Sequence, residues 1–417
     1  MTLPANQSRV AIVGAGHAGG RVAQHLRALG HRGPIALIGD EKHAPYERPA
    51  LSKELLLGEK TVADLTLAPV GFWSETHPDL RIDRHFARAR RVLTDRTELI
   101  LDDENSTRIL FDQLVIATGG TARIPGIEGA DDRRIHTLRT IDDCLALREA
   151  LAHCRTIAIV GGGVIGMEVA AAASKLGVKA TVFEAADRIM SRVLPQAASE
   201  WLAGVHRENG VTIEAGVRVR RIEHEAPSSW RVYYGEGADS VQADVVLLAA
   251  GIQCAVDFLN ETSIAGPDGI LVDAFCRSPV APWCYAAGDV AATANAFYGQ
   301  TLRQETWRNA ENQARAVAEF ISGRTEPFNE LPWMWTDQYG FNIQVVGHPG
   351  VDDCTVTRGV LGAGPTTLVS IREGRISGAV MINQGRERRV LERLIGERVT
   401  VNARRMADTS IALKEIA

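Results

Sequence analysis

Cysteine is scarce and scattered in this chain. No two cysteines form a C-x-x-C pair, and the six thiols among the 417 residues are Cys144, Cys154, Cys254, Cys276, Cys284 and Cys354. The scatter excludes a dense disulfide framework and a zinc site made of paired cysteines. Isolated thiols of this kind are expected to be buried and to pack as small hydrophobic side chains.

Long hydrophobic runs and a strong net charge are also missing. No apolar segment reaches the roughly 18 residues that a bilayer-spanning helix needs, and the first residues, MTLPANQSR, lack the charged-then-apolar pattern of a secretory signal. The 46 basic and 51 acidic side chains leave a net charge of -5. This balance gives no support to nucleic-acid or membrane-surface binding. We therefore expect a cytoplasmic protein that binds neither nucleic acid nor membrane.

What the chain does have is a strand, a glycine turn, a helix and a second strand within residues 9–41. At roughly 100 to 200 residues per domain, the length predicts two to four domains. The short β-branched run Val10–Val13 is typical of a strand buried on both faces of a parallel sheet. Gly14, Gly16 and Gly19 follow it and form G-x-G-x-x-G at the start of the predicted helix.

The same plan recurs in residues 156–185, where Gly161, Gly163 and Gly166 form the motif. A single G-x-G-x-x-G is weak support, because glycine-rich turns are common. Two of them, each inside a βαβ segment of about 30 residues that ends in an acid, predict two dinucleotide-binding sites. The glycines allow the backbone to approach a pyrophosphate, and the helix N-terminus offers it unpaired N–H groups.

The acid after each second strand is expected to accept hydrogen bonds from a ribose diol. In the first motif this acid is Asp40, with Glu41 as the alternative, and in the second it is Glu184. A carboxylate at this position repels a 2′-phosphate, so Glu184 favours NADH over NADPH. Arg188 and Arg192 lie nearby in the sequence and weaken this inference.

Two dinucleotide sites in one chain imply electron transfer between two cofactors. The expected partner of a nicotinamide is a flavin, since a flavin accepts a hydride and releases electrons singly. The segment CYAAGDVAA, residues 284–292, runs from an apolar strand into Gly288 and Asp289. Asp289 can bond the polyol of FAD if that strand points at the first site; an ordinary G-D turn is the alternative.

From Pro332 onward, short alternating segments predict an antiparallel domain closed by a helix near residues 386–395.

Seven segments together carry a family resemblance. In chain order they are GAGHAGG, YERPALSK, ATGG, GGGVIGMEVA, AAGDVA, ETWRNAENQA and PWMWTDQ. With these motifs the chain resembles the NADH-dependent, FAD-containing ferredoxin reductases of bacterial oxygenase systems, from about residue 9 to about residue 350 and more loosely beyond. The resemblance implies an α/β fold with two Rossmann-like dinucleotide-binding domains and an α+β C-terminal domain. It implies FAD in residues 1–118 and 248–325, NADH in residues 119–247, and the C-terminal domain in residues 326–417.

The resemblance also gives a role to the loop PYERPALSK. In the family this loop passes along the flavin ring, so Lys53 would lie beside its reactive edge and Glu168 would face Lys53 near the nicotinamide. We therefore predict a Lys53–Glu168 ion pair that positions the ring and stabilises the negative charge gained on reduction. Without the resemblance, a solvated lysine at a helix start, with Ser52 as its cap, would be the simpler interpretation.

Further residues match cofactor-contacting positions of the family. Arg123 matches an FAD contact, and Trp307 and Trp335 match positions that line the flavin, with Trp335 over one face of the ring. The other cofactor contacts implied are Ala18, Arg48, Ala89, Ile165 and Gly251. The segment GIQCAVD, residues 251–257, departs from the family pattern G-I-G-x-x-P-N. His17, inside the first motif, is expected at the surface.

The electrons must leave for an outside acceptor. Related disulfide reductases use a cysteine pair, but no cysteine precedes Cys144, which excludes a thiol relay in the first βαβ segment. The resemblance implies a [2Fe-2S] ferredoxin, and such carriers are usually acidic. Arg308, Arg315 and residues 385–405, with seven arginines and three glutamates, could steer one. An ordinary charged helix face is the alternative for residues 385–405.

Other functions remain open at this point. The acceptor could instead be a rubredoxin, a quinone or a small organic radical. The protein could also be an NADH-sensing flavoprotein, as a resemblance to apoptosis-inducing factor allows. We expect a monomer or a weak homodimer.

Overall fold

The computed structural model describes residues 5–74, 81–226, 229–295, 297–350 and 352–416. Its backbone contacts divide the chain into two compact units. Unit 1 comprises residues 1–49, 61–121 and 253–330, and unit 2 comprises residues 50–60, 122–252 and 331–417. The short strands β8 (Gly120–Ala122) and β16 (Ile252–Cys254) lie where the chain passes from one unit to the other.

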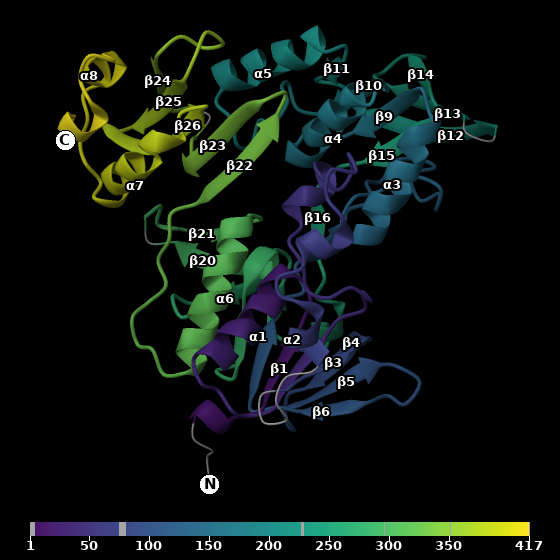
Figure 1. Cartoon of the computed structure of the whole chain (residues 1–417), viewed down its shortest axis with the longest axis vertical. Coiled ribbons are helices and arrows are strands. Elements are labelled where there is room, and N and C mark those ends of the chain that lie inside the picture. Colours follow the sequence, from purple (N-terminus) through teal and green to yellow (C-terminus); the bar gives the residue numbers. More distant parts are fainter. Residues whose placement is uncertain (1–4, 75–80, 227–228, 296, 351, 417) are drawn as a thin grey trace. The chain divides into compact units, whose positions relative to one another are not determined.

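Unit 1 is built on a five-stranded parallel sheet with the strand order β19-β7-β1-β2-β3. Alternate residues of β1 belong to two hydrophobic cores. Val10 and Ile12 pack with the helices α1 and α6, which lie side by side, and Ala11 and Val13 pack with the antiparallel strands β4 to β6 (Figure 1). Burial on both faces explains why this strand has no polar residue.

The elements of unit 1 fall into three groups. The parallel sheet contains β1 (Val10–Val13), β2 (Ile35–Ile38), β3 (Ile82–His85), β7 (Gln113–Ile116) and β19 (Cys284–Ala286). The other strands are β4 (Arg88–Leu93), β5 (Glu98–Asp102), β6 (Arg108–Leu110), β17 (Ala265–Gly266), β18 (Gly269–Val272), β20 (Ala291–Asn295) and β21 (Gln300–Arg303). The helices are α1 (His17–Ala28), α2 (Val70–Ser74) and α6 (Trp307–Ile321), with the short 3-10 helix η6 (Gly288–Val290) before β20.

Unit 2 contains a second parallel sheet with the order β11-β10-β9-β15 and an antiparallel C-terminal sheet with the order β22-β23-β26-β25-β24. The parallel sheet and its helices are β9 (Thr156–Val160), β10 (Lys179–Glu184), β11 (Thr212–Ala215), β15 (Val245–Leu248), α3 (Ile141–His153), α4 (Val164–Lys175) and α5 (Gln196–Glu208). The antiparallel strands β12 (Val219–Ala226), β13 (Ser229–Tyr234) and β14 (Ser240–Ala243) pack onto it.

The C-terminal sheet consists of β22 (Trp333–Gln338), β23 (Phe341–Gly347), β24 (Cys354–Arg358), β25 (Thr366–Arg372) and β26 (Arg375–Ile382). The helix predicted near residues 386–395 is α7 (Arg388–Gly396), and the short helix α8 (Ala403–Ala407) follows it. The predicted α/β class, with two Rossmann-like regions and an α+β C-terminal region, is confirmed. The division into three domains stays a prediction.

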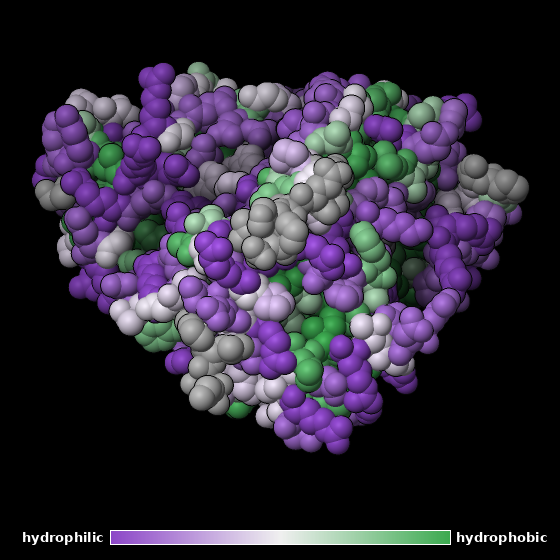
Figure 2. Space-filling view, turned by 60° about the horizontal axis from the view of Figure 1, so that its bottom comes forward, coloured by the Kyte–Doolittle hydropathy of each residue, from purple (hydrophilic) through white to green (hydrophobic). Residues whose placement is uncertain are grey.

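The composition led to two expectations: that the cysteines are buried, and that no segment spans a membrane. Cys144, Cys276 and Cys284 are buried as expected, but Cys354 is exposed at the start of β24, the edge strand of its sheet. The surface face in Figure 2 is covered mainly by hydrophilic residues, with hydrophobic ones in small groups between them. No helix within the described residues has the length and apolar character needed to span a lipid bilayer.

Candidate functional site

The first glycine motif forms a tight turn between β1 and α1 in unit 1. Gly14 has φ +112°, and a Cβ at this position would lie 2.2 Å from Ala117 O. A Cβ on Gly19 would lie 1.8 Å from Gly14 O, so the third glycine allows the helix to pack against the turn. Ala18 lies beside Gly288, which begins η6. The sequence therefore places its small residues where the backbone comes closest.

The start of α1 offers N–H groups to a ligand. Within the described residues, no side chain caps this helix at its N-cap Gly16. The guanidinium of Arg48 lies beside the same turn, with Nη2 3.2 Å from the position of a Cβ on Gly16. Unpaired N–H groups at a helix N-terminus and a neighbouring cation are what a pyrophosphate requires. The turn and Arg48 thus fit the phosphate end of FAD.

Strand register shows which residue of the first motif corresponds to Glu184 of the second. In each motif the first glycine's N–H donates to a strand carbonyl, that of Ile38 in unit 1 and that of Phe183 in unit 2. The residues that follow these carbonyls, Gly39 and Glu184, therefore correspond. A Cβ on Gly39 would lie 2.6 Å from the Cβ of Ala15, so the glycine loop of unit 1 leaves no room for a side chain here.

Asp40, the acid predicted for the first ribose, lies one residue beyond this position. Its side chain is half exposed, and its Oδ2 accepts a hydrogen bond of 2.7 Å from Arg88 Nε. Glu41, the alternative, is linked to the glycine turn through Arg48, whose Nη2 lies beside Gly16 and donates a hydrogen bond of 2.7 Å to Glu41 Oε1. The role of Asp40 at a ribose stays a prediction, and the contact with Arg48 favours Glu41.

Arg48 is held by a set of acidic groups. Its Nη1 donates to Tyr46 Oη at 2.8 Å, and Tyr46 Oη donates to Glu41 Oε2 at 2.5 Å. Burial lowers the pKa of Arg48, but the phenol oxygen of Tyr46 and the carboxylates of Glu41 and Asp289 outweigh this effect and raise it. Asp289 follows β19, which pairs in parallel with β7, so it lies at the carboxyl edge of the sheet that also carries Gly14. The condition for its predicted contact with FAD is met.

His17 was expected at the surface, and this expectation is wrong. Its side chain is only 8% exposed, and its Nε2 lies 2.8 Å from Glu311 Oε2 of α6. Its ring also contacts the edge of Trp307, with ring centroids 5.5 Å apart. The cause is tertiary, because α6 covers the start of α1. Trp307 thus lies at the start of α6 in unit 1, and Ala89 lies half-buried on β4.

The second glycine motif repeats this geometry in unit 2. Gly161 has φ +119°, and a Cβ on Gly166 would lie 2.0 Å from Gly161 O. In the part of the chain that the structure describes, Gly163 begins α4 without a side-chain cap, and no atom lies within 4 Å of the position of its Cβ. Ile165, the next predicted contact, is 37% exposed at this helix start. The motif offers the same free N–H groups as the first.

Glu184 is fixed at the end of β10 by two backbone hydrogen bonds. Gly162 N donates to its Oε2 at 2.7 Å, and Ala186 N donates to its Oε1 at 2.8 Å. The guanidinium of Arg188 donates to Leu194 O at 2.7 Å and to Ser191 O at 3.1 Å, so it is bound to backbone. A fixed carboxylate and an engaged arginine favour a ribose diol over a 2′-phosphate.

Lys53 and Glu168 come together inside unit 2. Lys53 Nζ lies 3.5 Å from Glu168 Oε1, and the two side chains are 13% and 5% exposed. The hydroxyl of Ser52 donates to Glu168 Oε2, and Thr336 Oγ1 donates to Glu168 Oε1 at 2.7 Å. Burial raises the pKa of Glu168, although Lys53 and the two hydroxyls act in the opposite direction. The ion pair is present as expected, and its role toward a flavin stays a prediction.

The remaining predicted FAD contacts lie in unit 2. Lys53 Nζ is 5.2 Å from the ring centroid of Trp335, close enough for a cation–π interaction. Arg123 donates through its backbone N to Gly251 O at 2.9 Å and through Nε to Ala250 O at 3.0 Å. Trp335 is therefore grouped with the Lys53–Glu168 pair, and Arg123 with Gly251.

Comparison with known proteins identifies the family of this chain. Residues 8–314 match the pyridine nucleotide-disulphide oxidoreductase family, and residues 333–417 match the reductase C-terminal family. The chain belongs to the pyridine nucleotide-disulphide oxidoreductase family. This membership confirms an enzyme that uses FAD and NAD(H). The six cysteines of the oxidoreductase are free, and none precedes Cys144.

The alignments with similar proteins cover nearly the whole length of this oxidoreductase. It is 36% identical over 406 residues to the ferredoxin–NAD(+) reductase component of the anthranilate 1,2-dioxygenase system of Burkholderia cepacia, which covers 97% of this chain and 98% of that protein. It is 35% identical over 408 residues to the corresponding component of the biphenyl dioxygenase system of Paraburkholderia xenovorans, with 98% of each chain covered. The covalent putidaredoxin reductase–putidaredoxin complex is similar in structure, with TM-score 0.91, 29% identity and 98% of each chain covered.

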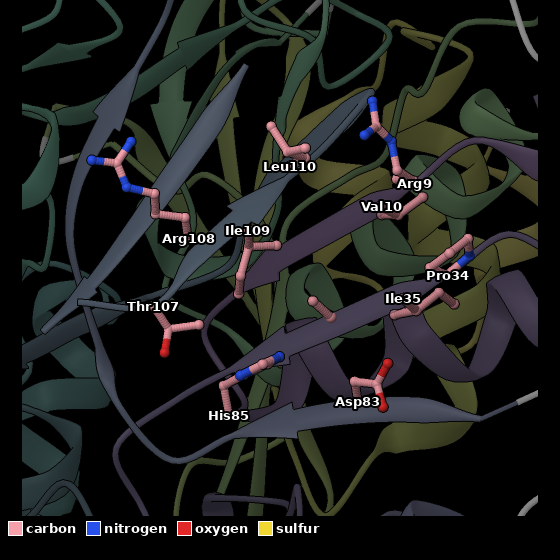
Figure 3. A pocket seen from close by; sticks show the side chains of 11 residues that line it. Arg9, Val10, Pro34, Ile35, Asp83, His85, Thr107, Arg108, Ile109 and Leu110 are labelled. Atoms are coloured by element: carbon pink, nitrogen blue, oxygen red, sulfur yellow. The ribbon is translucent and has the colours of Figure 1, made fainter. Parts of the chain in front are cut away.

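A pocket of about 210 Å³ in unit 1 of the oxidoreductase lies away from the glycine turn. It is lined by the first residues of β1 and β2, by β3 and by β6 (Figure 3). Its two arginines are already engaged, Arg9 with Asp112 at 2.7 Å and Arg108 with Glu98 at 3.0 Å. Dinucleotides bind outside the carboxyl ends of parallel strands. This pocket therefore does not qualify as a dinucleotide site.

Sequence reasoning did not assign four side chains to the oxidoreductase's Lys53–Glu168 group, and it considered Ser52 only as a helix cap. Ser52 and Thr336 bind Glu168, while Gln338 and His206 continue the hydrogen bonds away from it. Ser52, Thr336 and Gln338 lie inside the motifs YERPALSK and PWMWTDQ, which could have indicated them. No motif includes His206.

Gly14→Ala is expected to abolish retention of FAD by the oxidoreductase. The new Cβ would meet Ala117 O in a backbone conformation that favours glycine, so the turn must move. The measurement is the ratio of flavin to protein absorbance after purification. Gly204→Ala inside α5 is the control, because no described atom lies within 4 Å of its new Cβ, and we expect a gain of about 0.5–1 kcal/mol. Full flavin content in Gly14→Ala would contradict the assignment.

Proposed function

We propose that the protein is an NADH:ferredoxin oxidoreductase that passes a hydride from NADH to FAD and single electrons to a [2Fe-2S] ferredoxin serving an oxygenase. FAD supplies the exchange between two-electron and one-electron transfer. Similarity over the full length to ferredoxin–NAD(+) reductase components supports this substrate and this partner. The proposed FAD contacts are the first glycine turn, Asp40 or Glu41, Arg48, Lys53, Ala89, Arg123, Gly251, Asp289, Trp307 and Trp335, and the proposed NADH contacts are the second turn, Ile165, Glu168 and Glu184.

The observation that carries the proposal is the buried Lys53–Glu168 pair. Glu168 lies on α4, two residues after the last glycine of the NADH motif, and is 5% exposed beside an ammonium group. The carboxylate of Glu168 is fixed by hydrogen bonds from hydroxyls, and the ammonium of Lys53 is buried beside it. Such preorganised charges do not have to move when a bound ligand gains negative charge. Glu168 orients Lys53, and Lys53 offers a positive charge to the negative charge that FAD gains on reduction.

The chain also orients the nicotinamide cofactor. Glu184 is held by Gly162 N and Ala186 N and presents its carboxylate to a ribose diol. Holding NADH in one orientation supplies much of the catalysis of hydride transfer, because the reacting atoms no longer have to meet in the correct orientation by diffusion. The engaged Arg188 supports NADH as the preferred donor.

The test is anaerobic mixing of the FAD-loaded protein with NADH, followed by addition of electron carriers. We expect the flavin absorbance to bleach with NADH and a [2Fe-2S] ferredoxin to be reduced faster than a rubredoxin or a quinone under the same conditions. Bleaching followed by slow reoxidation with every carrier would favour the NADH-sensing flavoprotein. Absence of bleaching would contradict the proposal.

Arginines are proposed to guide the ferredoxin. Arg315 is exposed on α6, whereas Arg308 Nε donates to Glu330 Oε1 at 2.6 Å, so Arg315 is the better candidate in unit 1. In unit 2, the exposed arginines of the C-terminal segment are Arg386, Arg389, Arg393, Arg398, Arg404 and Arg405. The monomeric or weakly dimeric state and the cytoplasmic location remain predictions.

Arg315→Glu is expected to slow ferredoxin reduction at low salt while leaving reduction by NADH unchanged. Reversing one steering charge lowers the association rate by roughly tenfold, and salt removes the difference. The measurement is the second-order rate constant for ferredoxin reduction as a function of ionic strength. Arg96→Glu is the control, because Arg96 is exposed on unit 1 and the change in net charge is the same. Equal effects of the two variants would show that only net charge matters.

A further inference from the structure

A chain of hydrogen bonds leads from Glu168 to the tip of the β22–β23 hairpin. Thr336 Oγ1 donates to Glu168 Oε1 at 2.7 Å, and Gln338 Nε2 donates to Thr336 Oγ1 at 3.0 Å. His206 Nε2 lies 2.7 Å from Gln338 Oε1, and Tyr339 Oη lies 3.2 Å from His206 Nδ1. The hairpin tip lies beside α4 and α5, which carry Glu168 and His206 (Figure 1). All five side chains belong to unit 2.

The donor and the acceptor of each hydrogen bond in this series can be assigned by starting from the carboxylate of Glu168. Glu168 accepts from Thr336, so the amide of Gln338 must turn its Nε2 toward Thr336 and its Oε1 toward His206. An oxygen there requires an N–H on His206 Nε2. In a neutral ring Nδ1 then accepts from Tyr339. All donors point toward Glu168, and such an aligned series strengthens each of its members.

Burial supports this protonation state. His206, Thr336 and Gln338 are 0%, 0% and 2% exposed, so none of them can exchange its partner for bulk water. Burial lowers the pKa of His206 to about 4, with the hydrogen bond to Gln338 acting in the opposite direction, so the ring is neutral at pH 7. Burial also raises the pKa of Tyr339 to about 12, so its hydroxyl keeps its proton.

The backbone at the hairpin tip is strained. Tyr339 has φ +51° at the first position of a two-residue turn, where glycine, asparagine or aspartate is usual. Its ring packs edge-on against His206, with ring centroids 4.9 Å apart at 82°. A bulky residue in this conformation persists only where surrounding contacts hold it. The contact with His206 is such a constraint.

We propose that His206 is a positioning residue for reduction by NADH: through Gln338 and Thr336 it holds the carboxylate of Glu168 as an ionised acceptor directed at Lys53. The proposal rests on the role of Glu168 in the proposed function. Without the N–H of His206, the amide of Gln338 can turn over, and Thr336 then donates to Gln338 instead of Glu168. Glu168 loses a hydrogen bond that favours its charged form, so it is protonated at a higher pH.

The charged and titratable groups around this chain are few. In the described part of unit 2, Lys53 faces Glu168 from residues 50–60 at 3.5 Å, and Asp337 of β22 lies 4.0 Å from Lys53. His206 of α5 and Tyr339 of the hairpin lie at the other end. The acid limb of a pH profile for flavin reduction therefore reports on Glu168 with Lys53 as its counter-ion.

The test compares His206→Leu with His206→Gln in the FAD-loaded protein. We expect His206→Leu to move the acid limb of the flavin-reduction rate upward by roughly one pH unit, a loss of about tenfold on the acid side of the inflection that disappears on its alkaline side. The inflection in flavin reduction potential against pH moves the same way. His206→Gln, whose amide nitrogen can replace Nε2 as a donor, restores the wild-type profile.

Two further variants keep the test decisive. Thr336→Val removes the last donor and is expected to move the acid limb in the same direction, which covers the case that His206→Leu does not fold. His31→Leu is the control: His31 is 1% exposed in unit 1 and bonds Ser8 O, so this variant should lose stability without a pH shift.

The outcomes separate the inference from the proposed function. If wild-type protein is not reduced by NADH, the proposed function fails. If it is reduced, but the profiles of His206→Leu and Thr336→Val keep the wild-type inflection, only the inference on His206 is overturned. A loss of rate that is the same at every pH would likewise overturn it, because that result indicates a purely structural role.

Discussion

Lys53→Met is expected to lower the free energy of unfolding by about 3–5 kcal/mol and to slow reduction of FAD by NADH. It leaves the buried carboxylate of Glu168 without its counter-ion, and breaking a buried pair from one side costs this much. The double variant Lys53→Met, Glu168→Leu should regain most of the stability, since no uncompensated charge remains. Chemical denaturation measures the stability, and stopped-flow absorbance measures the reduction of the flavin.

A matched ion pair gives the control. Lys175 Nζ lies 2.6 Å from Glu59 Oε1 in the same unit, but the side chains are 63% and 48% exposed. Lys175→Met should therefore cost less than about 1 kcal/mol. Equal losses for Lys53→Met and Lys175→Met, or unchanged flavin reduction in Lys53→Met, would contradict the role of Lys53.

The loss in Lys53→Met should depend on pH. Burial already raises the pKa of Glu168 above its ordinary value, and removal of Lys53 raises it further. A carboxyl with a raised pKa in the folded state stabilises the fold when it is protonated, and this contribution is lost as pH rises through the folded-state pKa. The destabilisation by Lys53→Met is therefore largest above the raised pKa of Glu168 and shrinks as the pH falls below it.

Glu184→Ala is expected to weaken NADH binding by about 10- to 100-fold and to reduce the preference for NADH over NADPH. The variant loses the charged acceptor for the ribose diol and leaves Gly162 N and Ala186 N without their partner. It also removes the charge that repels a 2′-phosphate. Titration of both nucleotides, followed by fluorescence, gives the two dissociation constants.

Glu149→Ala is the control for Glu184→Ala. Glu149 is a carboxylate on α3 whose side chain is 79% exposed, so the change in net charge is the same. We expect its nucleotide affinities to equal those of the wild-type protein. If Glu184→Ala weakened NADH and NADPH by the same factor, Glu184 would not discriminate between them.

The glycine turns were predictable because their chemistry is local. A buried strand, a turn with positive φ and a helix start occupy about ten consecutive residues, so Gly14 and Gly161 could be assigned from spacing alone. The Lys53–Glu168 pair is different, since no spacing relates these two residues. It was expected only because the motifs around them resemble a known family.

Asp40 and His17 show where local reasoning stops. His17 lies inside the first motif and Asp40 follows the second strand of the same βαβ segment, yet the surroundings of each depend on another element. The register of β1 and β2 puts Gly39 opposite the glycine loop and leaves Asp40 beside Arg88. Helix α6, almost 300 residues further along the chain, buries His17 against Glu311.

The sequence by itself determined the fold class and the two dinucleotide turns of this protein, because those features depend on neighbouring residues and on burial patterns that every strand and helix carries. Only the tertiary structure decided what surrounds Glu168. Its hydroxyl partners, Ser52 and Thr336, come from positions 116 and 168 residues away, on segments that meet only after folding. A hydrogen bond needs contact within about 3 Å, and such contact between distant segments is a property of their packing.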